Sequence, residues 1–263
     1  MLIIKIGGGK ELNLKGIISD LATLNEKFII VHGANALRDE LAVKLNVQKK
    51  VVTSLSGYDS VLSNEETIDL MMMAYSGLKN KRIVELCQQN GINAVGLSGL
   101  DGKVIQGKRN SGIKVRENGK TLLLRDFSGK PKTINKELLS LLMDNGYTPI
   151  LCVPLIDENN FAINSENDDI VALLQTELKG NKVISLIEAP GFLLDKNDPS
   201  SLIKQISKTE LESLEEKVEG RMKRKILAIR KLFDGGDTTV IISDGRTEHP
   251  ILDALNGKGT TIS

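Results

Sequence analysis

The sequence has only two cysteines and two histidines in 263 residues. Cys87 and Cys152 both lie among apolar neighbours, which is typical of buried, reduced thiols. The two histidines, His32 and His249, are far apart in the chain. These residues offer no cluster of ligands for zinc or another soft metal. Any metal that acts here is therefore expected to be an oxygen-bound Mg²⁺.

Long apolar runs and an export signal are also lacking. The longest apolar run, residues 150–156, is far shorter than the roughly 20 residues that span a bilayer. The stretch LIIKI follows Met1 directly, with no basic region, no long apolar segment and no small-residue cleavage site. We therefore expect a cytoplasmic protein without a membrane segment.

No repeat, low-complexity tract or proline-rich linker interrupts the chain; instead, apolar strands alternate with amphipathic helices. The predicted strands are 2–6, 28–32, 92–97, 148–153, 182–187 and 238–243. The predicted helices are 14–25 with Asn13 as N-cap, 36–45, 64–89, 135–145, 167–178 and 221–234. This alternation predicts an α/β/α sandwich around a mostly parallel central sheet.

Residues 103–134 break the alternation. The stretch KVRENGKTLLL carries Asn118-Gly119 between two β-prone arms, which predicts an antiparallel hairpin insertion. From 103 to 136 there are ten Lys or Arg and only two acidic residues, so this segment carries a net charge of +8. Because the whole chain is +1, the remainder carries −7. Such segregation favours an acidic partner attracted over long range.

Nucleic acid is the alternative partner for any basic surface. The insertion has only Phe127 as an aromatic side chain for base stacking. It also contains no recognised RNA-binding or DNA-binding motif. We therefore expect no nucleic-acid partner.

A glycine-rich loop, KIGGG, follows the first predicted strand. Glycines such as Gly7 and Gly8 let backbone N–H groups approach phosphate oxygens closely, and Lys5 adds a compact positive charge. The lysine precedes the glycines, so this is not the GxxxxGK[ST] phosphate loop. In isolation, a KxGGG stretch is equally compatible with a plain turn at the end of a strand.

Two more loops that carry candidate functional residues lie before predicted helices. In AINSENDDIVALL, simple capping explains the acidic first turn but does not require Asn164. In EGRMKRKILAI, cations stand where the helix dipole disfavours them, so they need an anionic partner. Together with KIGGG, these loops converge on the edge of a parallel sheet where ligands bind.

The order of these motifs resembles the amino acid kinase family, and within it the acetylglutamate kinase branch. The resemblance is greatest to the [LysW]-aminoadipate kinases of that branch. It rests on KIGGG, VHGAN, AINSENDDIVALL, EGRMKRKILAI, GKGTTI and, most specifically, GLSGLDG followed by a basic hairpin. It implies transfer of the γ-phosphoryl group of ATP, with Mg²⁺, to a side-chain carboxylate. A carboxylate with a pKa of about 4 is already ionised and needs no general base.

The resemblance also implies roles for single residues. Lys5 and Lys225 would stabilise the transferring phosphoryl group, and Asp168 would orient both lysines. The implied phosphate-binding glycines are Gly7, Gly8 and Gly33. The implied acceptor-binding residues are Gly33, Ala34, Asn35 and Asn164. The stretch IEAPGF, residues 187–192, corresponds to the nucleotide loop, with Glu188 where the family usually has aspartate.

The basic insertion has a counterpart in the resembling kinases, whose amino acid substrate is presented on a small acidic carrier protein, LysW. The residues expected to contact such a carrier are Lys108, Arg109, Lys114 and Arg116. The resemblance divides the chain into an acceptor lobe, 1–172, and an ATP-binding lobe, 173–263. It also implies a homodimer, which agrees with the usual twofold symmetry of homo-oligomers.

The acceptor site departs from the family pattern. Ala34 and Asn35 stand where the second loop usually has glycine, and Val61 stands where an arginine is expected to clamp the substrate carboxylate. Arg38, one helical turn beyond Asn35, is a candidate replacement for that arginine. The acceptor is expected to be carrier-bound 2-aminoadipate, with carrier-bound glutamate also open.

Two other functions stay open on the sequence alone. A kinase of free N-acetylglutamate would share the motifs, but such a small acceptor does not require the +8 insertion. A non-catalytic sensor could retain the fold, but it does not need both Lys5 and Lys225.

Overall fold

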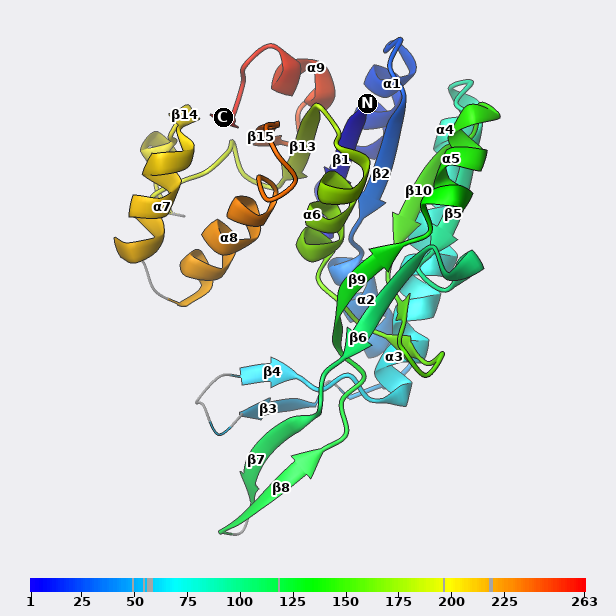
Figure 1. The fold of residues 1–263 in the computed structure, drawn as a ribbon, viewed down its shortest axis with the longest axis vertical. Helices are drawn as coiled ribbons and strands as arrows, with labels where there is room; N and C mark the ends of the chain where they lie inside the picture. The colour runs from blue at the N-terminus through cyan, green and yellow to red at the C-terminus, as the bar shows by residue number, and fades with distance from the viewer. Residues whose placement is uncertain (49, 54, 56–58, 118, 196, 218–219) are drawn as a thin grey trace.

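An eight-stranded sheet forms the centre of the protein (Figure 1). The computed structural model describes residues 1–263 except 49, 54, 56–58, 118, 196 and 218–219, and its description also excludes the side chains of 59–61, 117, 217 and 220–225. In spatial order the strands are β14 (Gln205–Ile206), β16 (Thr260–Ile262), β15 (Thr239–Asp244), β13 (Lys182–Ile187), β1 (Leu2–Ile6), β2 (Phe28–His32), β10 (Thr148–Cys152) and β5 (Ala94–Ser98). Every neighbouring pair is parallel except β15 and β16. The predicted mostly parallel sheet is thus confirmed.

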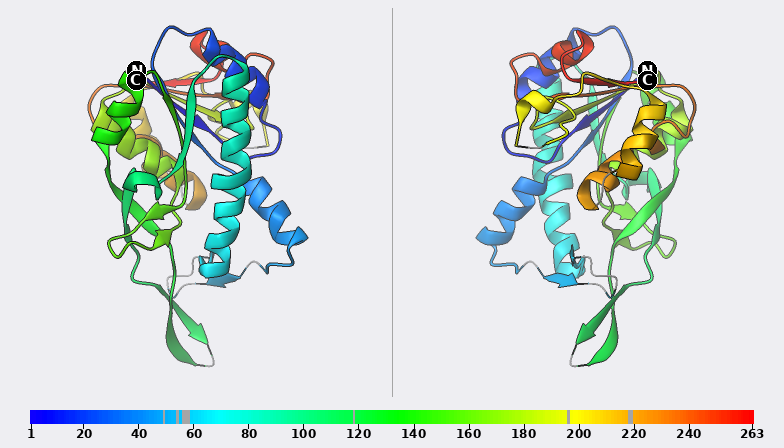
Figure 2. Two further views of the ribbon diagram at one scale, coloured as in Figure 1. Left: turned by 90° about the vertical axis from the view of Figure 1, so that its right-hand side faces the viewer. Right: turned by 90° about the vertical axis from the view of Figure 1, so that its left-hand side faces the viewer.

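Helices cover both faces of this sheet, as the sandwich prediction requires (Figure 2). Alternate residues of β1 enter different cores: Leu2, Ile4 and Ile6 face one side, and Ile3 faces the other. The first face packs against α1 (Leu14–Ala22), α4 (Asn80–Gln89) and α9 (Pro250–Leu255). The second face packs against α5 (Lys136–Asp144), α6 (Asn167–Leu178) and α8 (Gly220–Lys231), with α7 (Lys208–Lys217) beside α8.

The expected helix over 64–89 is a continuous helical rod. It consists of α3 (Glu65–Met71), a π-helical segment over Met72–Lys79 and α4. The Asn64 side chain caps its start by accepting a hydrogen bond from the Thr67 N–H at 2.9 Å. Asn13 likewise caps α1 by accepting from the Gly16 N–H, which confirms the predicted N-cap.

The insertion forms antiparallel structure beside the main sheet. A small sheet contains β12 (Ala162–Ile163), β11 (Leu155–Ile156), β6 (Ile105–Arg109) and β9 (Gly129–Ile134). Between β6 and β9, the hairpin of β7 (Ile113–Glu117) and β8 (Lys120–Leu124) extends away from the body of the protein (Figures 1 and 2). Of its predicted turn, Gly119 is described, with φ +75°, and Asn118 lies outside the described residues. A further hairpin, β3 (Val51–Thr53) and β4 (Asp59–Val61), packs on β7 and β8 through Val52 and Val115.

The two expected lobes share a helix, because residue 172 lies inside α6. The central sheet also continues across the proposed division, where β1 pairs with β13 over its whole length. The division at 172 therefore stays a prediction. Among the described residues, no helix is long and apolar enough to cross a membrane.

Because the histidine at the end of β2 is buried, we expect the stability of the folded protein to depend on pH. The Asn80 side chain donates to His32 Nε2 at 3.1 Å, and burial lowers the pKa of His32 from 6.5 to about 3. Below pH 6.5 the unfolded chain therefore binds a proton on His32, whereas His32 in the folded protein stays neutral down to about pH 3. We expect stability to fall between pH 6.5 and 3 by about 1.4 kcal/mol per pH unit from this residue alone.

Urea unfolding at pH 7, 5.5 and 4.5 measures this effect. The control is His32→Gln, which keeps a side-chain amide able to bond with Asn80 but does not titrate. Acidic groups contribute equally in the two proteins. The wild type should therefore lose more stability on acidification than the variant, by the amount that His32 contributes. Equal losses would show that His32 does not carry the effect.

Candidate active site

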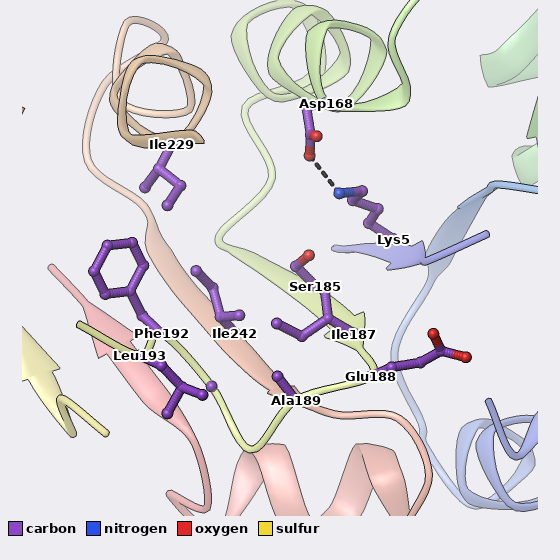
Figure 3. Close-up of a pocket in the computed structure, with 11 residues that line it drawn as sticks. Lys5, Asp168, Ser185, Ile187, Glu188, Ala189, Phe192, Leu193, Ile229 and Ile242 are labelled. Atoms are coloured by element: carbon purple, nitrogen blue, oxygen red, sulfur yellow. Dashed lines mark hydrogen bonds and ion pairs between the residues drawn. The ribbon is translucent and has the colours of Figure 1, made fainter. Parts of the chain in front are cut away.

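Lys5 and Asp168 meet at the carboxyl end of the sheet. Lys5 lies on β1 on the same face as Ile3, so its side chain is directed toward α6, whose first turn carries Asp168. The ammonium of Lys5 donates a hydrogen bond to Asp168 Oδ1 (Figure 3). The Lys5 side chain is 16% exposed and that of Asp168 49%. The pair is thus a shielded cation held by a carboxylate that still reaches solvent.

A cavity of about 320 Å³ adjoins this pair. In the strand register Lys5 lies beside Ser185, and Ser185 lies beside Ile242, so these three side chains form its floor. The complete lining is Lys5, Asp168, Ser185, Ile187, Glu188, Ala189, Gly191, Phe192, Leu193, Ile229 and Ile242 (Figure 3). An apolar cavity with a cation at one end suits a ligand that joins a flat base to an anionic group. The expected nucleotide loop, 187–192, forms one wall.

The two glycine loops are in direct backbone contact. A Cβ on Gly33 would lie 2.7 Å from the backbone nitrogen of Gly8, and a Cβ on Gly8 would lie 2.7 Å from that of Asn35. The Ala36 N–H also donates to the Gly8 carbonyl at 3.0 Å. Gly33 is therefore required because the first loop lies against it. Gly7 donates its N–H to Leu186 at 3.0 Å, so it gives the loop its shape, and phosphate binding by Gly7 stays a prediction.

Glu188 joins the nucleotide loop to the first glycine loop. Its Oε1 accepts a hydrogen bond from the Glu11 N–H at 2.6 Å. A Cβ on Gly9 would overlap the Glu188 carboxylate. The third glycine of KIGGG therefore leaves room for this side chain. Glu188 also lines the cavity, so its carboxylate and the Lys5 ammonium border the same space.

The expected acceptor-binding residues Asn35 and Asn164 follow the second glycine loop and β12. Asn35 begins α2 (Asn35–Lys44), directly after the buried Ala34, and its Oδ1 accepts a hydrogen bond from the Tyr75 hydroxyl. Burial raises the pKa of Tyr75 to about 12, so this hydroxyl remains a donor. Asn164 follows β12 and donates from Nδ2 to Ser63 Oγ at 3.2 Å.

Tyr75 and Ser63 were not among the residues predicted from the sequence. Each becomes relevant only through a contact with a residue distant in the chain. The π-helical segment that carries Tyr75 is a type of irregularity often found at functional sites, but the methionine-rich sequence there gave no sign of it.

Two of the positions singled out in the sequence are described by their backbone alone, and a third has a local partner. Lys225 belongs to α8 and Val61 to β4, but both side chains lie outside the described part of the chain. Arg38 donates from Nε and Nη2 to Asp39 Oδ1 at 2.9 and 2.7 Å, so its guanidinium is already paired. Its role as a substitute clamp stays a prediction.

The expected carrier contacts divide into two groups. Lys108, Lys114 and Arg116 are exposed. The Arg109 guanidinium instead lies 3.9 Å from the centre of the Phe127 ring, and its Nε donates to the Asp126 carbonyl at 2.9 Å. Arg109 thus packs where the hairpin joins the small sheet, and its contact with a carrier stays a prediction.

Metal ligands are few. Among the described residues, no group of His, Cys, Asp or Glu side chains could hold a metal ion by itself. The exposed carboxylate of Asp168 at the cavity edge fits a metal whose other ligands come from nucleotide phosphates.

A parallel sheet with a lysine, glycine loops and an apolar cavity at its carboxyl edge fits a nucleotide-dependent phosphotransferase. Residues 1–244 match the model of the amino acid kinase family, and the chain belongs to this family.

Two curated relatives and one solved structure show the similarity. The [LysW]-aminoadipate kinase of Thermus thermophilus is 38% identical over 268 residues and matches 100% of both chains. The acetylglutamate kinase of Methanopyrus kandleri is 29% identical over 264 residues, again with 100% of both chains matched. Carbamate kinase from Giardia lamblia bound to AMP-PNP shares the fold, with a TM-score of 0.69 at 17% identity over 99% of this chain and 97% of that one. The protein is therefore an ATP-using phosphotransferase that acts on a carboxyl group.

Proposed function

We propose that the protein transfers the γ-phosphoryl group of MgATP to the side-chain carboxylate of 2-aminoadipate bound to a small acidic carrier protein of the LysW type. Carrier-bound glutamate is the second acceptor, and the products serve lysine or arginine biosynthesis. The observation that carries the proposal is the Lys5–Asp168 pair at the edge of the apolar cavity, next to the glycine loop whose Gly8 lies against the backbone of Asn35.

The chemistry needs positive charge more than proton transfer. An acceptor oxygen attacks the γ-phosphorus, the bond from that phosphorus to the β,γ-bridging oxygen breaks, and ADP leaves. The product is an acyl phosphate, and no proton moves. Lys5 stabilises the negative charge on the transferring group, and Asp168 holds the ammonium in place. Mg²⁺ would neutralise phosphate charge when bound near Asp168.

The outer face of the β7–β8 hairpin is suited to an acidic carrier. Lys114 and Arg116 point to the same side of the hairpin because they are two residues apart on β7. The side chain between them, Val115, is buried against Val52, so the basic side faces outward. The hairpin also connects to the acceptor site, since the Asn164 N–H donates to the Phe127 carbonyl at 2.7 Å.

Reversing charge on this face should weaken carrier binding. We expect the double variant Lys114→Glu/Arg116→Glu to raise the KM for carrier-bound aminoadipate about 30-fold at low salt, with kcat nearly unchanged, because the lost attraction acts before chemistry. Steady-state kinetics at low and high salt measures this. High salt should reduce the difference between variant and wild type, since it screens exposed charges.

The matched control is Lys15→Glu/Arg82→Glu. These residues are exposed on α1 and α4, on the opposite face of the sheet, and the net charge changes equally. An equal rise in KM in both double variants would mean that total charge matters and the hairpin face does not.

A coupled ADP-release assay distinguishes the possible acceptors. Carrier-bound aminoadipate, carrier-bound glutamate, N-acetylglutamate and free aminoadipate are offered in parallel with MgATP. We expect the highest kcat/KM with carrier-bound aminoadipate. Turnover of N-acetylglutamate alone would identify an acetylglutamate kinase, and ATP binding without any turnover would identify a sensor. The proposed homodimer and cytoplasmic location are separate predictions.

A further inference from the structure

Asp169, directly after the catalytic Asp168, holds two lysines from different parts of the fold. Its Oδ2 accepts a hydrogen bond from Lys130 of β9 at 2.5 Å, and its Oδ1 accepts from Lys231 of α8 at 2.7 Å. The Asp169 side chain is only 10% exposed. Burial alone would raise the pKa of this carboxyl, but the two lysines hold it below its usual range.

The contact between Asp169 and Lys231 lies beside a cavity at the junction of α6 and α8. A cavity of about 540 Å³ lies between the start of α6 and α8, and its lining is Lys130, Glu166, Asp168, Asp169, Leu227, Ala228 and Lys231. Among the side chains that the structure describes, Lys231–Asp169 is the only ion pair from α8 to an element other than α7. Apolar side chains of α6 and α8 share one core, and the ion pair adds a polar contact between the two helices beside this cavity.

Helix α8 contributes directly to the nucleotide site. Its Ile229 lines the 320 Å³ cavity beside Lys5 and Asp168. The same helix carries Lys225, the expected second phosphoryl-facing lysine. A displacement of α8 relative to α6 would thus move one wall of the nucleotide cavity.

We propose that Asp169 is a positioning residue that fixes α8 against α6 and β9 through Lys231 and Lys130. It aligns the nucleotide wall with the Lys5–Asp168 pair. Neither Lys130 nor Lys231 lines the nucleotide cavity itself. The inference rests on the proposed function only for the expected effect on kcat.

The test combines Asp169→Asn, Asp169→Glu and Lys231→Gln with two readouts. We expect Asp169→Asn to lower kcat about 30-fold and raise the KM for ATP several-fold, with the KM for the acceptor unchanged. Lys231→Gln should give a similar but smaller loss, and Asp169→Glu should recover part of kcat because the charge returns. The double variant Asp169→Asn/Lys231→Gln should be little worse than Asp169→Asn, since both changes break one contact.

Hydrogen exchange over residues 226–231 gives a readout without any acceptor. The amides there should exchange faster in Asp169→Asn and Lys231→Gln than in the wild type. The control is Lys27→Gln, which breaks an exposed ion pair with Asp144 far from α8. If Asp169→Asn does not fold, Lys231→Gln alone tests the proposal. The Lys231 side chain is 45% exposed, so we expect this variant to fold.

Unchanged exchange and unchanged kcat in the folded variants would overturn the inference, as would fully additive losses in the double variant. If the wild type phosphorylates none of the acceptors, the proposed function fails, while hydrogen exchange and ATP affinity still decide whether Asp169 positions α8.

Discussion

Replacing Lys5 by methionine is expected to lower kcat about a thousand-fold, while the protein stays folded and still binds ATP. Methionine matches the length of the lysine stem but removes the charge. In phosphoryl transfer the protein contributes mainly position and positive charge, and loss of one preorganised group of this kind costs a factor of about 10²–10³ or more. Lys5 is also the partner of Asp168, which would lose its cation. Single-turnover kinetics with saturating MgATP measures the chemical step.

Lys10→Met is the control for this experiment. Lys10 lies in the same loop region, but its side chain is 81% exposed and pairs with Glu40 at 3.5 Å. We expect nearly wild-type kcat in this variant. Retention of more than a tenth of kcat in Lys5→Met would contradict the role given to Lys5.

Replacing Gly33 by alanine is expected to cost about 2 kcal/mol of stability and about a hundredfold in activity. The added Cβ would lie 2.7 Å from the Gly8 nitrogen and 2.8 Å from its Cα. Both atoms are backbone, so the clash can be relieved only by moving one glycine loop, and overpacking of this kind typically costs about 1–3 kcal/mol. The movement would shift the loop that follows Lys5. Urea unfolding and kcat/KM measure the two effects.

Gly77→Ala provides the comparison for Gly33→Ala. In the helical rod, a Cβ on Gly77 meets only the Met72 carbonyl oxygen, at an ordinary 3.5 Å. Alanine should therefore leave activity unchanged and raise stability by about 0.4–1 kcal/mol. If Gly33→Ala were as stable and active as Gly77→Ala, the two loops would not be in the contact described.

The layered fold could be predicted because each of its signals is local. The apolar run of 2–6, the caps at Asn13 and the periodicity of 167–178 each specify an element without reference to distant residues. Strands β14 and β16 are two and three residues long, too short to show a pattern. Helix α7 is rich in charge and has a weak apolar face, so its sequence was not recognised as helical.

The candidate site was predictable to the extent that its residues lie in motifs. Lys5 and Asp168 lie 163 positions apart, yet each could be named from its own motif, Lys5 on β1 directly before the glycines and Asp168 in the first turn of α6. The contacts of Asn35 with Tyr75 and of Asp169 with Lys231 depend on how helices pack, which no local pattern reports. The position of the Arg109 guanidinium over the Phe127 ring likewise depends on packing and could not be predicted from charge alone.

The most direct test of the account is to trap the product. Wild-type protein is incubated with MgATP, carrier-bound aminoadipate and hydroxylamine, which converts an acyl phosphate into a stable hydroxamate. We expect one hydroxamate on the carrier for each ADP released by the wild type. With Lys5→Met, neither hydroxamate nor ADP should rise above background. Release of ADP without hydroxamate, or equal yields from wild type and Lys5→Met, would contradict phosphoryl transfer to a carboxylate at this site.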